Sequence, residues 1–250
     1  YKQAHMIRFL LVCITVIGFL ILSIPILIVE WIIGKFNPYK KDTSSLHLIQ
    51  SVFRFILWLT GVEVTVIGEE LVPTDEAVLY IGNHRSFFDI LLTYTRCPRL
   101  TGYIAKAEME KIPLLSNWMH YLHCLFLDRK DIKKGLKTIL SGIELIKSGI
   151  SVCIFPEGTR NKGEELSLLP FHNGSFKIAE KTGCPIIPMS LNNTCDIFEG
   201  HFPFIKKTHV ILEYGKPIYP KELDKDEKKR IGEYCSNIIS ETIHKNQALV

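Results

Sequence analysis

The stretch Ala77–Asp89, which reads AVLYIGNHRSFFD, decides the fold that we predict for this chain. It opens with a short apolar run and breaks at Gly82-Asn83 before a polar cluster. A short apolar run that ends in a Gly-Asn break is typical of a buried strand followed by a turn. The apolar residues from Phe87 onward then predict a helix packed against a sheet. His84 is therefore expected at the carboxyl end of a strand, where open α/β sheets bind their ligands.

His84 and Asp89 form the first candidate catalytic pair, because they straddle the predicted turn and the chain can bring them together there. A carboxylate bonded to a histidine ring fixes its tautomer and stabilises the imidazolium, which makes the histidine a general base. The same spacing recurs at His123 and Asp128. That second pair is expected within a strand, where side chains five positions apart point to opposite faces. The predicted turn favours the first pair over the second. The spacing alone is not specific, and a turn histidine of no catalytic role is the alternative.

Strands and helices are predicted to alternate through the rest of the chain. Strands are expected at 62–67, 77–81, 102–105, 124–127, 150–155, 185–191 and 209–214, and helices at 112–119, 175–181 and 226–244. A further helix begins after Asp131 as its cap, with a core face made of Leu136, Ile139, Leu140, Ile143 and Ile146. This alternation predicts an α/β fold with a mostly parallel sheet flanked by helices.

The N-terminal part of the chain is more apolar than the rest. The 21 residues from Phe9 to Val29 carry no charge, and a helix of that length rises about 30 Å, enough to cross a bilayer core. Pro25 is expected to kink or interrupt it. A second segment, 46–59, predicts an amphipathic helix that lies on the membrane or against the first helix. We therefore expect an N-terminal region of two hydrophobic, membrane-associated helices at 1–60 and a catalytic α/β domain at 61–250, with spanning and monotopic insertion both open.

The composition narrows the classes of function. The net charge of +4 and the lack of a basic run with interleaved aromatic residues argue against nucleic-acid binding. Seven scattered cysteines without a C-x-x-C pair indicate a reduced, cytosol-facing environment. No pair of His or Cys residues has zinc spacing, and there is no G-x-S-x-G nucleophile motif. The sequence therefore predicts neither a metal site nor a serine nucleophile.

Polar side chains follow four of the predicted strands, and the carboxyl ends of parallel strands share one edge of a sheet. Lys106, Arg129 and Arg160 would converge there, which suggests a ligand that carries a phosphate, since Arg grips phosphate oxygens in a bidentate manner. Each arginine also has a simpler alternative, an ion pair with a nearby carboxylate. The four clusters are Asn83-His84, Lys106, Asp128-Arg129 and Glu157 to Arg160, and the alternative partners are Asp128 or Asp131 for Arg129 and Glu157 or Glu164 for Arg160.

Four motifs occur in the order found in the glycerolipid acyltransferases. They are N-H-x4-D at 83–89, F-x-D-R at 126–129, F-P-E-G-T-R at 155–160 and P-I-I-P at 185–188. With its hydrophobic N-terminus, the chain resembles the 1-acyl-sn-glycerol-3-phosphate acyltransferase (lysophosphatidic acid acyltransferase) family from Gly61 to Leu191. The family usually has glycines near Ser116 and at His123, so His123 would add bulk close to the acceptor site.

The resemblance implies transfer of a fatty acyl group to the sn-2 hydroxyl of lysophosphatidic acid, giving phosphatidic acid. The donor would be acyl-CoA or acyl carrier protein, a thioester co-substrate, with no metal and no other cofactor. Membrane lipids would be further partners, and the enzyme would be membrane-associated with its active site on the cytosolic face, at the plasma membrane if bacterial. An acyltransferase for a different lysolipid and a non-catalytic lipid-binding membrane protein are the alternatives.

The resemblance also implies roles for individual residues. His84 would be the general base, oriented by Asp89. Glu157 would fix the motif loop or the glycerol hydroxyl, and N–H groups around Gly158 or after His84 are candidate donors to the oxyanion. The implied substrate-binding residues are Lys106, Asp128, Arg129, Glu157, Gly158, Thr159 and Arg160, of which Lys106, Arg129 and Arg160 would hold the acceptor phosphate.

Overall fold

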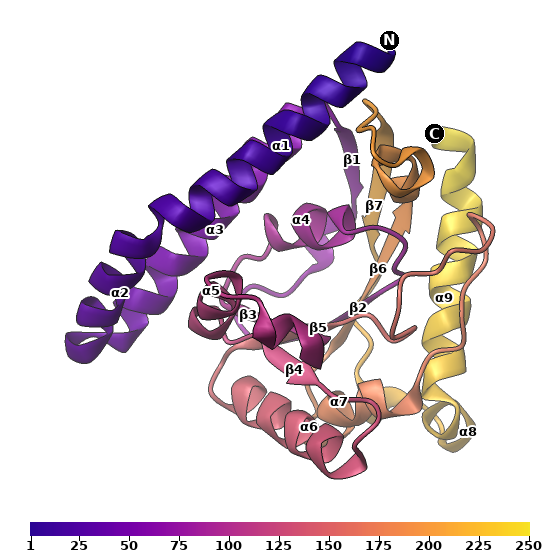
Figure 1. Ribbon diagram of the computed structural model, residues 1–250. Helices are drawn as coiled ribbons and strands as arrows, with labels where there is room; N and C mark the ends of the chain where they lie inside the picture. The colour runs from indigo at the N-terminus through magenta and orange to yellow at the C-terminus, as the bar shows by residue number, and fades with distance from the viewer.

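The computed structural model describes residues 1–250, and its centre is a seven-stranded sheet (Figure 1). The strand order is β1-β7-β6-β2-β5-β3-β4. Neighbouring strands are parallel except for β6 and β7, so the predicted α/β fold with a mostly parallel sheet is confirmed. The strands are β1 (Glu63–Ile67), β2 (Leu79–Gly82), β3 (Thr101–Lys106), β4 (Leu125–Leu127), β5 (Ser151–Ile154), β6 (Ile186–Asn192) and β7 (His209–Tyr214).

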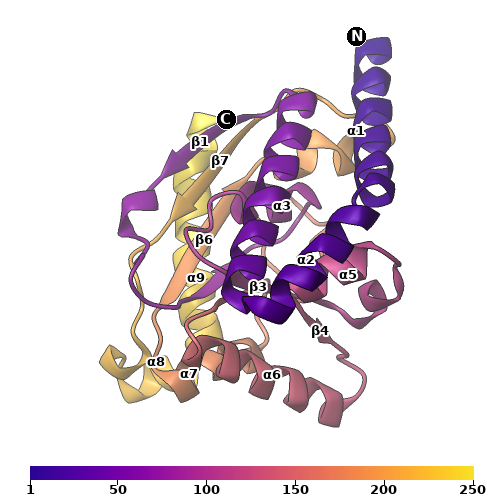
Figure 2. The same cartoon turned by 90° about the vertical axis from the view of Figure 1, so that its left-hand side faces the viewer.

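Helices cover both faces of this sheet. Figure 2 shows α3 in front of the sheet and α9 behind it. Successive residues of β2 alternate between the two faces: Tyr80 belongs to the core shared with α3 and α4, and Leu79 and Ile81 belong to the core shared with α6, α7 and α9. The helices are α1 (Lys2–Leu22), α2 (Ile24–Phe36), α3 (Pro38–Thr60), α4 (Phe88–Tyr94), α5 (Leu115–Tyr121), α6 (Ile132–Lys147), α7 (Lys177–Thr182), α8 (Lys225–Lys229) and α9 (Ile231–Asn246).

The uncharged N-terminal run is divided between two helices. The interruption expected at Pro25 occurs at Ser23, two residues earlier, and Pro25 lies in the first turn of α2, where its missing N–H costs nothing. The Ser23 hydroxyl is buried and accepts a hydrogen bond from Trp118 Nε1 at 2.9 Å, which ties the break to α5. By length and composition, α1 is the one helix long and apolar enough to cross a membrane.

The amphipathic segment expected at 46–59 is the larger part of α3, which begins earlier, at Pro38. Its inner side contributes Leu46, Ile49 and Ile56 to the first core. Its Gln50 side chain donates hydrogen bonds to the carbonyls of Tyr94 and Cys97, at 3.1 and 2.9 Å. The helical region is therefore packed onto the sheet domain through α3.

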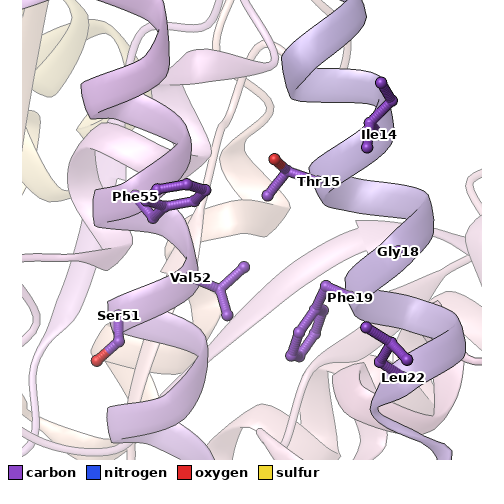
Figure 3. Close-up of a pocket in the computed structure, with 8 residues that line it drawn as sticks. All are labelled: Ile14, Thr15, Gly18, Phe19, Leu22, Ser51, Val52 and Phe55. Atoms are coloured by element: carbon purple, nitrogen blue, oxygen red, sulfur yellow. The ribbon is translucent and has the colours of Figure 1, made fainter.

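The outer sides of α1 and α3 expose apolar side chains, and a groove of about 510 Å³ lies between them (Figure 3). Ile14 on α1 and Phe55 on α3 stand at its rims, 67% and 48% exposed. None of the predicted site residues lines this groove. The lining residues are Ile14, Thr15, Gly18, Phe19, Leu22, Ser51, Val52 and Phe55.

The core face predicted for α6 is partly wrong. Asp131 caps the helix as expected, with its carboxylate accepting from the N–H groups of Lys133 and Lys134. Ile143 and Ile146 are buried, whereas Leu136 and Leu140 are 60% and 53% exposed. Only the side of α6 that carries Ile143 and Ile146 is covered by the rest of the protein. The neighbouring apolar side chains, Leu136 and Leu140, face solvent.

Candidate functional site

The four polar clusters predicted at strand ends lie along one edge of the sheet. Strands β2, β5, β3 and β4 are consecutive neighbours, and each pair is parallel. The loops that follow them therefore leave the sheet on the same side. This edge carries the candidate site.

His84 and Asp89 meet at the end of β2. The Nδ1 atom of His84 is 2.8 Å from Oδ2 of Asp89, and the same oxygen accepts the N–H groups of Arg85 and Ser86 at 2.7 and 2.8 Å. The second oxygen of the buried Asp89 carboxylate has no hydrogen-bond partner. Asp89 lies in the first turn of α4, where free N–H groups and the helix dipole favour a carboxylate. The carboxylate thus holds both the ring and the loop that carries it.

The backbone and ring of His84 are fixed by the segment after β5. The His84 N–H donates to Glu157 Oε1 at 2.8 Å, and its carbonyl accepts from the Asn161 N–H at 2.7 Å. The ring stacks on Phe155 with 4.3 Å between ring centroids. The His84 side chain is 14% exposed, and its Nε2 atom makes no hydrogen bond within the chain. With the proton on Nδ1, Nε2 is the acceptor that remains for a substrate.

Glu157 binds the loops around the site. Its second oxygen, Oε2, accepts the N–H of Leu169 at 2.8 Å, while Oε1 accepts from His84. Burial raises the pKa of Glu157, and the two N–H donors counteract part of that rise. These contacts match the expected fixing of the motif loop, and the carboxylate is fully engaged in the chain itself.

Arg129 lies against the loop that Glu157 fixes. Gly158 has a φ of +79°, and a Cβ atom there would overlap the Arg129 guanidinium, so only glycine allows this approach. Partial desolvation lowers the pKa of Arg129. The ion pairs suggested as alternatives do not form: Asp128 accepts the N–H of Lys130, and Asp131 caps α6. Arg129 is therefore a cation without a carboxylate partner.

Arg160 pairs with a residue that the sequence did not indicate. Its NH1 atom is 3.2 Å from Oε1 of Glu199, rather than near Glu157 or Glu164. The guanidinium lies over the ring of Phe87, 3.8 Å from the ring centroid. Lys106 at the end of β3 and Thr159 are exposed, and Lys106 forms no ion pair. Of the three predicted cations, Arg160 belongs to the motif loop and Arg129 lies against it at Gly158.

Two further polar residues in the His84 loop fix its position: Arg85, which the sequence did not indicate, and Asn83, which was predicted only as part of a polar cluster. Arg85 is 7% exposed; it donates to the carbonyls of Gly163 and Glu164, and its Nε is 3.2 Å from Glu165. The Asn83 amide pairs with the N–H and the carbonyl of Leu191, at 2.8 and 2.9 Å. Both side chains anchor the loop to other segments.

His123 bonds to Asp42 of α3, with Nε2 and Oδ2 2.8 Å apart, and makes no pair with Asp128. The reason given from sequence is wrong, because β4 begins only at Leu125 and His123 precedes it. The backbone at His123 has a φ of +60°, a left-handed conformation that favours glycine. No group of three or more His, Cys, Asp or Glu side chains is arranged to hold a metal ion.

A family model and a solved structure match this chain. A family model described as Acyltransferase matches residues 63–192, which include both the His84 loop and the motif after β5. The structure of the 1-acyl-sn-glycerophosphate acyltransferase PlsC from Thermotoga maritima superposes with a TM-score of 0.84, at 23% identity, over 99% of this chain and 98% of that chain. This likeness shows the fold.

Sequence relatives give the family. A 1-acyl-sn-glycerol-3-phosphate acyltransferase of Borreliella burgdorferi is 30% identical over 189 residues, 75% of this chain and 74% of that protein. One of Saccharomyces cerevisiae is 30% identical over 181 residues, 72% of this chain and 58% of that protein. A chloroplastic one of Brassica napus is 32% identical over 209 residues, and the match spans 59% of its length. The chain belongs to the acyltransferase family, among relatives that are 1-acyl-sn-glycerol-3-phosphate acyltransferases.

Proposed function

We propose that this chain transfers a fatty acyl group from acyl-CoA or acyl carrier protein to the sn-2 hydroxyl of lysophosphatidic acid, making phosphatidic acid. The observation that carries the proposal is the His84–Asp89 pair, with Nε2 of His84 unbonded at the sheet edge where Arg129 and Arg160 lie. A base and cations suited to a phosphate at the same sheet edge are the groups that this transfer needs, which supports the proposal.

In this mechanism, Nε2 of His84 takes the proton of the acceptor hydroxyl while the hydroxyl oxygen attacks the thioester carbon. Asp89 keeps the proton of the neutral ring on Nδ1 and stabilises the imidazolium that forms. The tetrahedral intermediate then collapses, the carbon–sulfur bond breaks, and the thiolate leaves. The imidazolium returns its proton to that sulfur, so the base is regenerated without a cofactor.

The oxyanion of the intermediate needs hydrogen-bond donors. Most of the N–H groups suggested from sequence already have partners within the chain. Thr159 and Arg160 follow Gly158 in the motif loop, and their N–H groups donate no hydrogen bond in the structure. We assign these two N–H groups to the oxyanion. The occupied groups are those of Arg85, Ser86, Phe87, Phe88 and Gly158.

The acceptor phosphate is assigned to Arg129 and Arg160. Arg129 has no carboxylate partner, and Arg160 contacts Glu199 through NH1 alone. Both guanidinium groups therefore keep N–H donors for phosphate oxygens. Lys106, exposed at the end of β3, adds positive charge to the same edge.

The exposed apolar sides of α1 and α3 support a position at a membrane, where acceptor and product both reside. In this proposal residues 1–60 are the membrane-associated region, residues 61–250 are the catalytic domain, and the site faces the cytosol. Docking the helices brings the sheet edge to headgroup depth, so a lipid hydroxyl reaches His84.

An acceptor panel tests the substrate assignment. Purified protein is assayed with lysophosphatidic acid, lysophosphatidylglycerol and monoacylglycerol, each with acyl-CoA and acyl carrier protein donors. The proposal requires the highest kcat/KM with lysophosphatidic acid. A higher value with lysophosphatidylglycerol would assign the other lysolipid function, and an absence of transfer in all arms would favour a non-catalytic lipid-binding protein.

A further inference from the structure

Glu199 lies outside all four sequence motifs, in the 3₁₀ turn Glu199–His201, yet its carboxylate contacts both halves of the site. Its Oε2 accepts the Ser86 hydroxyl at 2.7 Å, and its Oε1 accepts the Phe87 N–H at 2.8 Å. The same Oε1 is 3.2 Å from NH1 of Arg160. One carboxylate thus joins the His84 loop to the motif loop after β5.

We infer that Glu199 is a positioning residue for acyl transfer, which holds the His84 loop in its working shape and presents Arg160 to the acceptor phosphate. The inference rests on the function proposed above. It assigns Glu199 no contact with the substrate.

The first part of this role concerns the loop between His84 and Asp89. The Ser86 N–H holds the Asp89 carboxylate, and the Ser86 hydroxyl also accepts the N–H of Phe88 at 3.0 Å. Glu199 fixes the same hydroxyl from the other side. Without Glu199 the Phe87 N–H and the Ser86 hydroxyl both lose their acceptor, which loosens the loop on that side. Small displacements of catalytic groups cost large factors in rate.

The second part concerns the orientation of Arg160. Glu199 binds its NH1 atom, and the Phe87 ring covers one face of the guanidinium. The guanidinium of Arg160 is thereby held in one orientation, with N–H groups that neither contact uses. Two such N–H groups are needed to bind a phosphate in a bidentate manner. The Glu199 carboxylate also repels a phosphate, so its charge and its orienting contact with Arg160 act in opposite directions on acceptor binding. We take orientation as the larger effect, and the acceptor KM of Glu199→Gln tests this.

Glu199 is itself held in place by packing. The preceding Phe198 stacks on Phe9 of α1, with 5.7 Å between ring centroids, and also contacts Phe202. The Ile205 N–H donates to the carbonyl of His5 at 3.3 Å. The turn is therefore attached to the first helix, and the Glu199 side chain is only 17% exposed. These contacts distinguish it from a mobile surface glutamate.

The test compares Glu199→Ala and Glu199→Gln with Glu213→Ala as the matched control. Glu213 is 14% exposed and also carries an ion pair, at 2.9 Å from Lys245, but it lies on β7 and its side-chain partners, Lys245 and Asn246, belong to α9. Glu199→Ala should lower kcat about ten- to a hundredfold and raise the KM for lysophosphatidic acid. In Glu199→Gln the amide can still serve Phe87 and Ser86, so kcat should recover while the acceptor KM stays raised. The KM for the thioester and all constants of Glu213→Ala should stay at wild-type values.

An NMR measurement without substrate tests the loop directly. The downfield signal of the His84 Nδ1 proton reports its bond to Asp89, and it should shift or broaden in Glu199→Ala but not in Glu213→Ala. An unchanged signal overturns the inference. An acceptor KM in Glu199→Gln below the wild-type value also overturns it, because the carboxylate would then oppose phosphate more than it orients Arg160. Absence of turnover in the wild type is the separate failure of the proposed function, and the NMR result still decides the role of Glu199.

Discussion

His84 Nδ1 lies 2.8 Å from Asp89 Oδ2, and that oxygen is also the anchor of the backbone between the two residues. The pair is therefore local: five positions of sequence, one turn and the start of one helix create it. The Phe155 ring and Glu157 then hold the histidine from the neighbouring strand end.

Replacing His84 with alanine should reduce turnover by about two to four orders of magnitude, the usual effect of losing a general base. The fold should be retained, because the ring contributes a stacking contact while Glu157 still binds the backbone N–H. Steady-state assays and circular dichroism measure the two effects. Near-normal turnover would remove the base assignment.

His123→Ala is the matched control for that variant. Its ring bonds to Asp42 on α3, so its loss should leave turnover within about tenfold while loosening the contact of α3 with the loop before β4. A loss of turnover equal to that of His84→Ala would show that the wrong histidine was chosen.

Arg160→Ala should weaken binding of the acceptor more than binding of the thioester. Charge-assisted hydrogen bonds to a phosphate contribute about 1.5–3 kcal/mol each, which corresponds to roughly ten- to a hundredfold in acceptor KM. Arg96→Ala is a fitting control, since Arg96 is about as exposed as Arg160, at 34% and 32%, and pairs with the surface residue Glu69. A change confined to the KM of the acyl donor would contradict the phosphate role.

Glu157→Gln should change how stability depends on pH. Burial raises the folded-state pKa of Glu157, so its contribution to stability is full below the unfolded pKa of about 4.3 and is lost as the pH rises through the folded value. Glutamine lacks this dependence. The wild type should therefore gain stability relative to the variant as the pH falls from about 7 to about 4. Urea unfolding in detergent at both pH values measures the difference, and a relative loss at low pH would refute the argument.

Ile17→Glu on α1 should weaken membrane binding without disturbing the core, because Ile17 is 58% exposed. A charged residue at the centre of a bilayer helix costs about 2.5–3.5 kcal/mol, which corresponds to a loss of at most roughly four-hundredfold in binding. Activity should fall on acceptor in bilayers and less on acceptor in detergent micelles. Leu136→Glu, at a 60% exposed position of α6, is the control and should leave membrane binding and activity in either medium unchanged. Liposome flotation measures the membrane binding directly. Equal losses of activity in bilayers and in micelles would mean that α1 forms part of the active site rather than attaching the protein to the membrane.

The sequence predicted the parts of the structure that depend on local patterns. Apolar runs that end in polar clusters located β2 and β5, and Asp131 indicated the start of α6 because a cap acts on N–H groups two and three residues away. The position of His84 and Arg129 at the same edge of the sheet followed from the prediction that the strands are parallel.

The parts that were missed depend on packing between distant segments. Glu199 is 112 positions from Phe87 and lies in no motif, so no spacing relates the two. Leu136 has the periodicity of a core residue, but α6 contacts the sheet along too narrow a stripe to cover it. His123 was placed within a strand because its neighbours are apolar, whereas its left-handed backbone precedes β4.

The most direct test of the central claim is mass-spectrometric measurement of phosphatidic acid made by purified protein from lysophosphatidic acid and an acyl thioester, wild type beside His84→Ala. We expect one free thiol for each phosphatidic acid formed, and a rate lower by about two to four orders of magnitude in the variant. Absence of phosphatidic acid with every thioester donor, or equal rates in the two proteins, would contradict the claim.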